Sequence, residues 1–485
     1  MSPIPVPESL PASSAPRSLP IFLVICTAVF MTNLDLRVVN VALDAIGRDL
    51  AGQSLSGLSW VINGYTVALA ALLIVAGRLG DRSGLRRLFL IGTVIFTIAS
   101  LGCALAPNLG ILVAVRVLQA TGAAILLPAS LSLLLHGVPA ERRHTAARIW
   151  SAVGALAAAS GPALGGLLIE ASWRWVFVIN VPIGIAVVFF GFRILADDVA
   201  QRDASPRQPL PDVIGSGLLA AGVAALTGAI VQGPDWGWTS GRVIGLAALA
   251  LVALIWFFQR CATQPVPLIE LNLWRIRAFA IANVGSFLFS ISFAIMLLSN
   301  SLWCQGIWGY SALMTGLAMA PGPAVVPFVA IASNRAIGRY GAGIVIAIGS
   351  LLFAAAQIWR VTQASASGSY AWDLLPSLIL SGIGTGLAFS TMIASGSTAL
   401  PANRSATGAA VLNTGRQIAS AIGVAILVAA LGNSALGPQS VHAFHVAWGI
   451  SAVLVAAAAV VTFFLPRDRV ASDAPERSPV LATAE

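Results

Sequence analysis

Four charged residues lie well inside long apolar stretches of this chain, where a charge is costly. They are Asp35, Arg37, Arg116 and Arg416. A charge at the centre of a membrane helix costs at least about 2.5–3.5 kcal/mol on insertion scales, so such residues normally face a cavity and have partners. A carboxylate beside an arginine stays ionised, and it takes up a proton when the two groups separate in a poorly solvated site. Reversible proton binding is therefore the chemistry that these residue types favour.

Depth along the apolar stretches indicates which arginine is the partner of Asp35. The first stretch ends near Leu43, which places Asp35 about 12 Å below that end at 1.5 Å per residue. The fourth stretch runs in the opposite direction from near residue 109, which places Arg116 about 10 Å below the same surface. Arg37 points about 200° away from Asp35 on a helix. We predict that Asp35 pairs with Arg116 as a proton switch; a static ion pair that holds the two helices together is the alternative.

The elements that must position these residues follow from the composition. The chain has 485 residues, of which 58% are hydrophobic and only 9% charged, whereas soluble domains carry about 25% charged residues. This composition predicts a polytopic membrane protein. A helix needs about 20 apolar residues to cross the hydrocarbon core. Fourteen candidate spans begin near residues 20, 57, 88, 109, 146, 175, 212, 243, 278, 311, 342, 373, 406 and 441.

The arginines are distributed unequally between alternate loops. The net charge of +9 comes wholly from arginine, and most of it lies on one side of the predicted spans. The other side has four arginines, which are Arg48, Arg174, Arg242 and Arg360. The arginine-rich side faces the cytoplasm, so we expect a multi-pass protein of the cytoplasmic membrane with both termini inside. Because the arginines are spread over many loops, no nucleic-acid partner is expected.

No pattern in the sequence indicates an enzyme. The cysteines Cys26, Cys103, Cys261 and Cys304 have no spacing that suggests a metal site or a disulfide framework. No nucleophile–base constellation and no phosphate-binding loop is found either. We therefore expect no catalytic residue, no cofactor and no metal.

One loop occurs twice. GRLGDRSG at residues 77–84 corresponds to NRAIGRYG at residues 334–341, and a shift of 257 residues places Arg78 on Arg335 and Gly84 on Gly341. The same shift places the start of the first span on the start of the ninth. We predict a disordered cytoplasmic N-terminus (1–19), a six-helix bundle (20–195), a linker with two extra spans (196–276), a second six-helix bundle (277–465) and a disordered cytoplasmic tail (466–485).

Five motifs carry a resemblance to a known family. They are TNLDLRVVNVAL (32–43), GRLGDRSGLRR (77–87), RVLQATGAA (116–124), GPALGG (161–166) and WRWVFVINVPIG (173–184). Together they resemble the major facilitator superfamily, and within it the fourteen-span drug:proton antiporters. In the first motif Arg37 replaces the Thr of the family pattern and Asp44 replaces its Pro.

The resemblance implies an all-α major facilitator fold of two six-helix bundles plus two additional central spans. It also implies a proton-coupled antiporter that exports small lipophilic drugs or antibiotics by alternating access, with a substrate site near the midplane between the halves. The alternatives are an exporter of an endogenous metabolite or an uptake symporter of the same fold. The expected partners are protons, a small amphipathic substrate and the lipid bilayer, and we expect a monomer.

Polar residues inside the spans are candidates for the wall of the substrate cavity. They are Asn33, Arg37, Asn40, Gln119 and Asn180 in the first half and Asn413, Arg416 and Gln417 in the second. We expect no acid within any span between residues 278 and 465. The cavity would then hold one acid against three arginines, which favours neutral, zwitterionic or acidic lipophilic substrates over dications.

The resemblance also implies a cytoplasmic gate and a close helix contact that it associates with antiport. The gate residues are Gly77, Asp81, Arg82, Gly84, Arg86 and Arg87. Asp81 would meet a helix N-terminus or an arginine in only one conformation; the alternative is that this loop only fixes the topology.

The close contact is expected between spans 5 and 10, which small residues would bring together in lipid. Its residues are Gly154, Ala158, Gly161, Pro162, Gly165 and Gly166 on span 5, and Gly316 and Ala320 on span 10. The alternative for this contact is ordinary helix packing.

Overall fold

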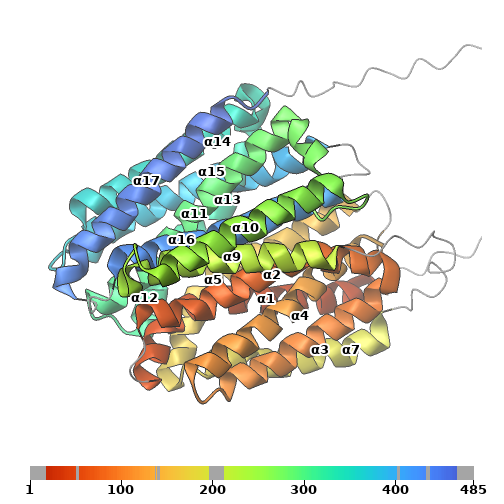
Figure 1. The fold of residues 1–485 in the computed structure, drawn as a ribbon, viewed down its shortest axis with the longest axis horizontal. Helices are drawn as coiled ribbons and strands as arrows, with labels where there is room; N and C mark the ends of the chain where they lie inside the picture. The colour runs from red at the N-terminus through yellow and green to blue at the C-terminus, as the bar shows by residue number, and fades with distance from the viewer. Residues whose placement is uncertain are drawn as a thin grey trace, which may run out of the picture. The chain divides into compact units, whose positions relative to one another are not determined.

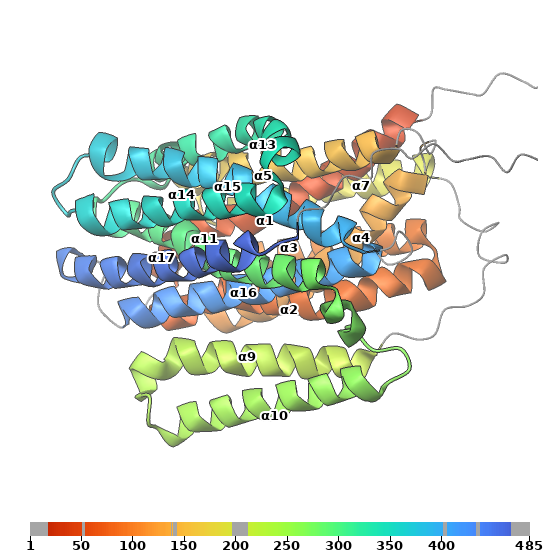
Figure 2. The same ribbon diagram turned by 90° about the horizontal axis from the view of Figure 1, so that it is seen from above.

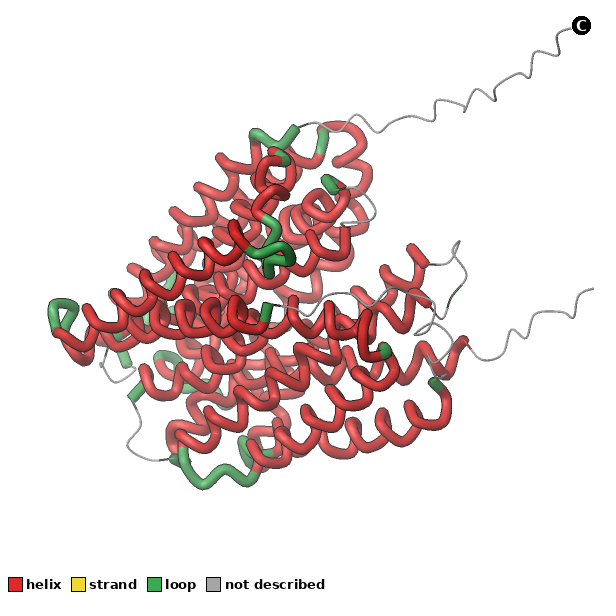
Figure 3. The backbone as a smooth tube through the Cα atoms, turned by 45° about the vertical axis from the view of Figure 1, so that its right-hand side comes forward, coloured by secondary structure: helices red, strands yellow, loops and turns green. Residues whose placement is uncertain are grey.

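The structure is a computed structural model of the chain and describes residues 18–50, 54–136, 138, 143–195, 212–400, 405–432 and 437–466. These residues form helices joined by loops, and no strand occurs among them (Figure 3). The chain divides into two compact units. The first unit is Met1–Leu268 with Ser301–Ala320, and the second is Ile269–Asn300 with Pro321–Glu485.

Most helices of the first unit are long enough to be spans. They are α1 (Ser18–Asp49), α2 (Leu55–Ser83), α3 (Leu85–Ala104), α4 (Leu109–His136), α5 (Arg143–Ala171), α6 (Trp175–Val178), α7 (Asn180–Ile194), α9 (Val213–Trp236), α10 (Gly241–Thr263) and α12 (Ala312–Met319).

The second unit contains η2 (Leu271–Arg275), α13 (Pro321–Tyr340), α14 (Ala342–Gln363), the π-helical turn η3 (Tyr370–Leu374), α15 (Leu375–Thr398), α16 (Ser405–Leu431), η5 (Pro438–Ser440) and α17 (Val441–Phe463). Helix α11 (Arg277–Gly306) begins in the second unit and ends in the first (Figure 1).

The fourteen predicted spans are all present as helices. Thirteen helical segments of the described residues are long and apolar enough to cross a membrane, and α5 is a further helix of 29 residues. Three of the thirteen combine a short helical element with the next helix: α6 continues into α7, α12 into α13, and η3 into α15. The predicted starts differ from the helix starts by at most three residues, so the predicted fold class is confirmed.

The repeated loop has the same backbone geometry in both places. Gly84 is the single residue between α2 and α3, with φ of +89°. Gly341 is the single residue between α13 and α14, with φ of +88°. A residue with a Cβ is strained at such an angle, so glycine allows the chain to reverse in one residue. Both copies of the repeated loop therefore reverse the chain at a single glycine.

Close helix packing is also repeated between the units. In the first unit a Cβ on Gly92 of α3 would lie 2.8 Å from the backbone nitrogen of Leu126 on α4. In the second unit a Cβ on Gly349 of α14 would lie 2.8 Å from the backbone nitrogen of Ala388 on α15. Residue 349 is 257 positions after residue 92, the same shift as in the loop. Backbone contact of this kind is the usual way in which helices associate in lipid.

The two extra spans form a hairpin within the first unit. Helices α9 and α10 lie side by side, and α9 packs on α2 (Figure 2). The hydroxyl of Ser56 on α2 donates to Asp235 of α9 at 2.6 Å. Arg260 of α10 forms an ion pair with Asp212, which caps α9, at 2.7 Å. Helix α10 exposes large apolar side chains such as Trp256, as expected for a lipid-facing helix.

Candidate functional site

A buried polar cluster lies inside the first unit. It joins Asp35 of α1, Ser100 of α3, Arg116 and Gln119 of α4, and Asn180 at the start of α7. Each of these five residues is at most 1% exposed. Burial of a charge in such a place is tolerated only when hydrogen bonds and an opposite charge compensate it. The cluster is therefore built around its charged pair.

The carboxylate of Asp35 is bonded through both oxygens. Arg116 donates to Oδ2 at 2.6 Å. The side-chain amides of Gln119 and Asn180 donate to Oδ1 at 3.0 and 2.9 Å. Three donors from two other helices thus hold the carboxylate, and the pair expected from helix depth is present.

The guanidinium of Arg116 is enclosed as completely as its partner. Its Nε donates to the carbonyl of Val61 on α2 at 3.2 Å, and its Nη1 also donates to the Gln119 side-chain oxygen at 2.7 Å. The rings of Tyr65 and Phe177 lie 4.2 and 5.6 Å from its guanidinium carbon. Aromatic faces attract a cation, most strongly where water is excluded. Arg116 would therefore stay in place if Asp35 became neutral.

Gln119 and Asn180 bind Asp35 in this structure. Both are fully buried, and their amides donate to its carboxylate. Gln119 also donates to the Ser100 hydroxyl at 2.7 Å. Their place on the wall of a substrate cavity stays a prediction, because polarity alone does not show which way a residue on a uniformly apolar helix points.

The polar residues of α1 are bonded mainly along their own helix. Asn33 donates to the carbonyl of Val29 at 2.9 Å, and Asn40 donates to that of Leu36 at 3.2 Å. Asn33 and Arg37 are half-buried, and Asn40 is buried. In the second unit Asn413, Arg416 and Gln417 are half-buried on α16, and the Arg416 guanidinium carbon lies 4.1 Å from the centre of the Phe389 ring.

The balance of one acid against three arginines needs correction. Asp35 and Arg116 neutralise each other inside the first unit. The other two arginines that were counted, Arg37 and Arg416, lie on α1 of the first unit and on α16 of the second.

Sequence reasoning missed two buried charged residues of the second unit. Arg360 was assigned to a loop, but it lies in α14 with no exposed surface. It donates to the Ser377 hydroxyl and to the Gln357 side-chain oxygen, each at 2.9 Å. Asp373, in the first turn of the span Tyr370–Gly396, is 5% exposed and accepts from the backbone N–H of Ser365 at 3.0 Å. The expectation that no acid lies within a span of residues 278–465 was therefore wrong.

The glycines of α5 face two different helices. A Cβ on Gly161 would lie 2.5 Å from the Cβ of Arg37, and one on Gly165 would lie 2.9 Å from a methyl of Val38. Gly154 lies beside Asn33. These three glycines thus pack on α1, and the expectation that this face meets span 10 was wrong. The side chain of Ala158 lies outside the described part of the structure.

The contact between α5 and span 10 is made by other residues of the same motif. A Cβ on Gly316 of α12 would collide with the carbonyl of Pro162, and one on Gly166 would collide with that of Ala312. Ala320 follows α12 and joins it to α13. Spans 5 and 10 therefore meet at backbone distance, one residue further along the helix than the four-residue spacing suggested.

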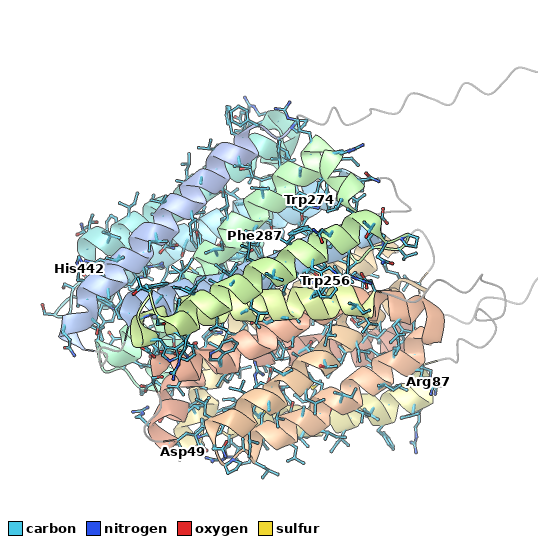
Figure 4. All side chains as sticks on the ribbon, viewed as in Figure 1. Asp49, Arg87, Trp256, Trp274, Phe287 and His442 are labelled. Atoms are coloured by element: carbon cyan, nitrogen blue, oxygen red, sulfur yellow. The ribbon has the colours of Figure 1, made fainter. Side chains whose placement is uncertain are left out.

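The predicted gate residues lie at one end of the first unit. Gly77 is in α2, and the backbone of Asp81 and Arg82 completes that helix, but their side chains lie outside the described part. Arg86 donates to the carbonyl of Phe192 on α7 at 2.7 Å. Arg87 is exposed, and Figure 4 shows it at the end of the unit opposite Asp49.

The other end of the first unit has a polar contact that sequence reasoning missed. Asp49 accepts from the Trp173 indole at 2.8 Å and from Arg174 at 2.6 Å. Trp173 is itself buried and packs edge-on against Phe177. This chain of contacts connects the end of α1 with the segment that carries Phe177 and Asn180 to the Asp35–Arg116 pair.

Comparison with known proteins agrees with this architecture. The family model of the Major Facilitator Superfamily matches residues 25–424. The chain is 34% identical over 406 residues to the methylenomycin A resistance protein of Streptomyces coelicolor, covering 83% of each chain. It is 32% identical over 407 residues to the multidrug resistance protein Stp of Mycobacterium tuberculosis, covering 82% of this chain and 73% of that one.

Among solved structures, that of a bacterial homologue of the human lysosomal transporter Spinster has a TM-score of 0.66 at 16% identity, covering 93% of this chain and 98% of that one. At this identity the likeness shows the fold alone. The matches in sequence and the helical architecture together show that the chain belongs to the major facilitator superfamily and is a membrane transporter rather than an enzyme.

Proposed function

We propose that this protein is a proton-coupled antiporter that exports small lipophilic antibiotics or drugs across the cytoplasmic membrane. The observation that carries the proposal is the buried Asp35–Arg116 pair. Among the described residues three aspartates are buried, namely Asp35, Asp212 and Asp373. Asp212 caps α9 and Asp373 lies in the first turn of its span, so Asp35 alone lies near the middle of a spanning helix.

The geometry supports a switch at Asp35 because its three donors come from two other helices, α4 and α7, so a change of helix packing within the first unit would withdraw them from α1. While Arg116, Gln119 and Asn180 bind it, the carboxylate is held in its charged form. Withdrawal of these donors leaves a charge in a poorly solvated site, and the carboxylate then takes up a proton. A membrane potential supplies about 2.3 kcal/mol per proton for each 100 mV.

The relatives support export, and the charge of Arg37 supports a substrate class. The two relatives above are named for resistance to methylenomycin A and to multiple drugs, and a cephamycin export protein of Amycolatopsis lactamdurans is 33% identical to this chain over 91% of both chains. Because Arg37 stands where the family pattern has an uncharged Thr, we infer substrates that are neutral, zwitterionic or acidic. Export of an endogenous metabolite of this class is the alternative.

We also propose roles for the close contact and the loop. The tight packing of Gly316 on Pro162 and of Gly166 on Ala312 would exclude water along α5 and α12, which suits an exchanger that must not leak protons. Asp81 in the loop of residues 77–87 would stabilise one of the two alternating states. The working unit would be a monomer with both termini in the cytoplasm.

The test is transport by Asp35→Asn in proteoliposomes. Substrates come from a panel of neutral, acidic and cationic lipophilic antibiotics to which the expressed protein confers resistance. We expect the variant to lose accumulation driven by an imposed pH gradient and to keep downhill exchange. The matched control is Asp44→Asn, which removes a carboxylate of the same helix that pairs with Arg48 at 2.9 Å.

Accumulation by Asp35→Asn at the wild-type rate would disprove Asp35 as the proton site. Substrate that moves in the same direction as the proton would instead indicate a symporter. Proton-coupled transport without resistance to any member of the panel would favour the endogenous metabolite.

A further inference from the structure

A groove of about 460 Å³ lies between α3 and α7 of the first unit, which pack side by side (Figure 1). Its size falls in the range of ligand sites, about 300–1,000 Å³. Thr97 of α3 and Gly184 of α7 touch and form its floor. Apolar side chains form its walls, including Ile98, Val188 and Phe189.

The walls of the groove face the outside of the unit. Ile98 is 63% exposed and Phe189 is 47% exposed. In a chain of spanning helices, exposed apolar side chains of this kind face lipid chains. The groove therefore opens towards the bilayer, and its natural occupant is hydrocarbon.

Positive charge gathers at one end of the groove. Arg193 lines it and lies in the last turn of α7, with its guanidinium carbon 4.2 Å from the centre of the Phe189 ring. Arg86 and Arg87 belong to the first turn of the facing helix α3. Because Arg86 donates to the carbonyl of Phe192 at 2.7 Å, it ties α3 to α7 at this end. Arginine forms strong charge-assisted hydrogen bonds with phosphate oxygens.

We propose that the groove binds one anionic phospholipid, with an acyl chain along α3 and α7 and the phosphate at Arg193 and Arg87. Basic sites between membrane helices bind anionic head groups by the same chemistry. The arginines at this end attract a head group of net negative charge more strongly than a zwitterionic one, whose phosphate is offset by its own cation.

Such a lipid would contact the helices that support the buried cluster. Gly184 lies one helical turn after Asn180, and Thr97 lies three residues before Ser100. Occupancy of the groove should therefore fix the separation of α3 and α7, on which the hydrogen bonds to Asp35 depend.

The test uses the purified full-length protein in detergent, titrated with phosphatidylglycerol or with phosphatidylcholine of the same acyl chains. Bound lipid is counted by native mass spectrometry and the Tm is measured in parallel. We expect the wild type to bind one phosphatidylglycerol in preference to phosphatidylcholine, with a higher Tm. Arg193→Gln should weaken phosphatidylglycerol binding about fivefold, the effect of one basic residue near an anionic lipid.

Two variants separate a site from general attraction. Val188→Phe fills the groove without changing charge and should reduce binding of the preferred lipid. Arg339→Gln removes an exposed arginine that lies over the ring of Tyr340 in α13 and should leave the preference intact. Any of three results would overturn the proposal. The wild type could bind the two lipids equally, or both Arg193→Gln and Val188→Phe could keep the wild-type preference. Arg339→Gln could also lose as much phosphatidylglycerol binding as Arg193→Gln.

Discussion

The two units share their turns and helix contacts but differ in their buried charges. Gly84 and Gly341 reverse the chain at nearly the same φ, and Gly92 and Gly349 pack equally closely on the next helix. The first unit buries a carboxylate and an arginine in mid-helix. In the second unit Arg360 is bonded to hydroxyl and amide side chains.

The sequence repeat shows at which positions the buried charges of the two units differ. A shift of 257 residues places Ser100 on Gln357 and Cys103 on Arg360. Ser100 and Cys103 of α3 both contact Gln119 of α4. Arg360 of α14 contacts Ser377 of α15 and also bonds Gln357 of its own helix. The same interface thus has a neutral side chain in one unit and a buried guanidinium in the other. The repeat preserves what the fold requires, while the proposed proton-binding group, Asp35, is present in one half.

The largest effect is expected from changes to the Asp35–Arg116 pair. A single and a double variant together distinguish its structural role from its proposed role in proton coupling. Asp35→Asn leaves a buried arginine without its counter-charge, which typically costs about 3–5 kcal/mol of stability. The double variant Asp35→Asn/Arg116→Gln removes both charges and should recover most of this loss, yet remain unable to couple transport to protons. Tm and proteoliposome transport are measured together.

A matched change in the second unit is Asp373→Asn, which removes a buried carboxylate at the start of a span. Proton-driven accumulation should persist in this variant. Loss of coupling there, or restored coupling in the double variant, would show that the two units do not differ as we propose.

A smaller effect is expected from Arg360→Met in the second unit. It removes hydrogen bonds to Ser377 and Gln357 and leaves their polar groups buried, at a cost of about 1–3 kcal/mol. We expect a lower Tm with an unchanged ratio of substrate accumulated to pH gradient imposed. A changed ratio would show that Arg360 takes part in coupling, and the contrast between the units would then be one of degree.

The last prediction concerns the two glycine turns, where matched substitutions should have equal effects on the two units. Gly84→Ala and Gly341→Ala each place a Cβ at a φ near +90°, which costs about 1–3 kcal/mol. Because the turn geometry is repeated, the two variants should lower the Tm by similar amounts. A large difference between them would show that the repeat in backbone geometry hides different packing around the two loops.

Much of the fold could be predicted because the relevant signals are local. The starts of the fourteen spans follow from apolar length, and the glycine turns follow from the repeated motif. The pairing of Asp35 with Arg116 followed from depth, because each residue of a helix advances by a fixed 1.5 Å. These inferences need only distances along the chain or along a helix axis.

The remaining site depended on helix rotation and on lateral neighbours. The amides of Gln119 and Asn180 point to Asp35, and Gly161 faces Arg37 rather than span 10. Arg360 is buried in α14 although it lies four residues from the end of its helical segment. A helix that is apolar all round carries little information on which face is turned to which neighbour.

The sequence by itself therefore determined the number, the length and the repeat of the spans, and the matching depth of Asp35 and Arg116. Only the tertiary structure decided which side chains surround Asp35, which helix each glycine face meets, and that α3 and α7 leave a groove with arginines at one end. The physical reason is that crossing the bilayer constrains each helix separately through its apolar length, whereas side-chain partners depend on how several helices pack together.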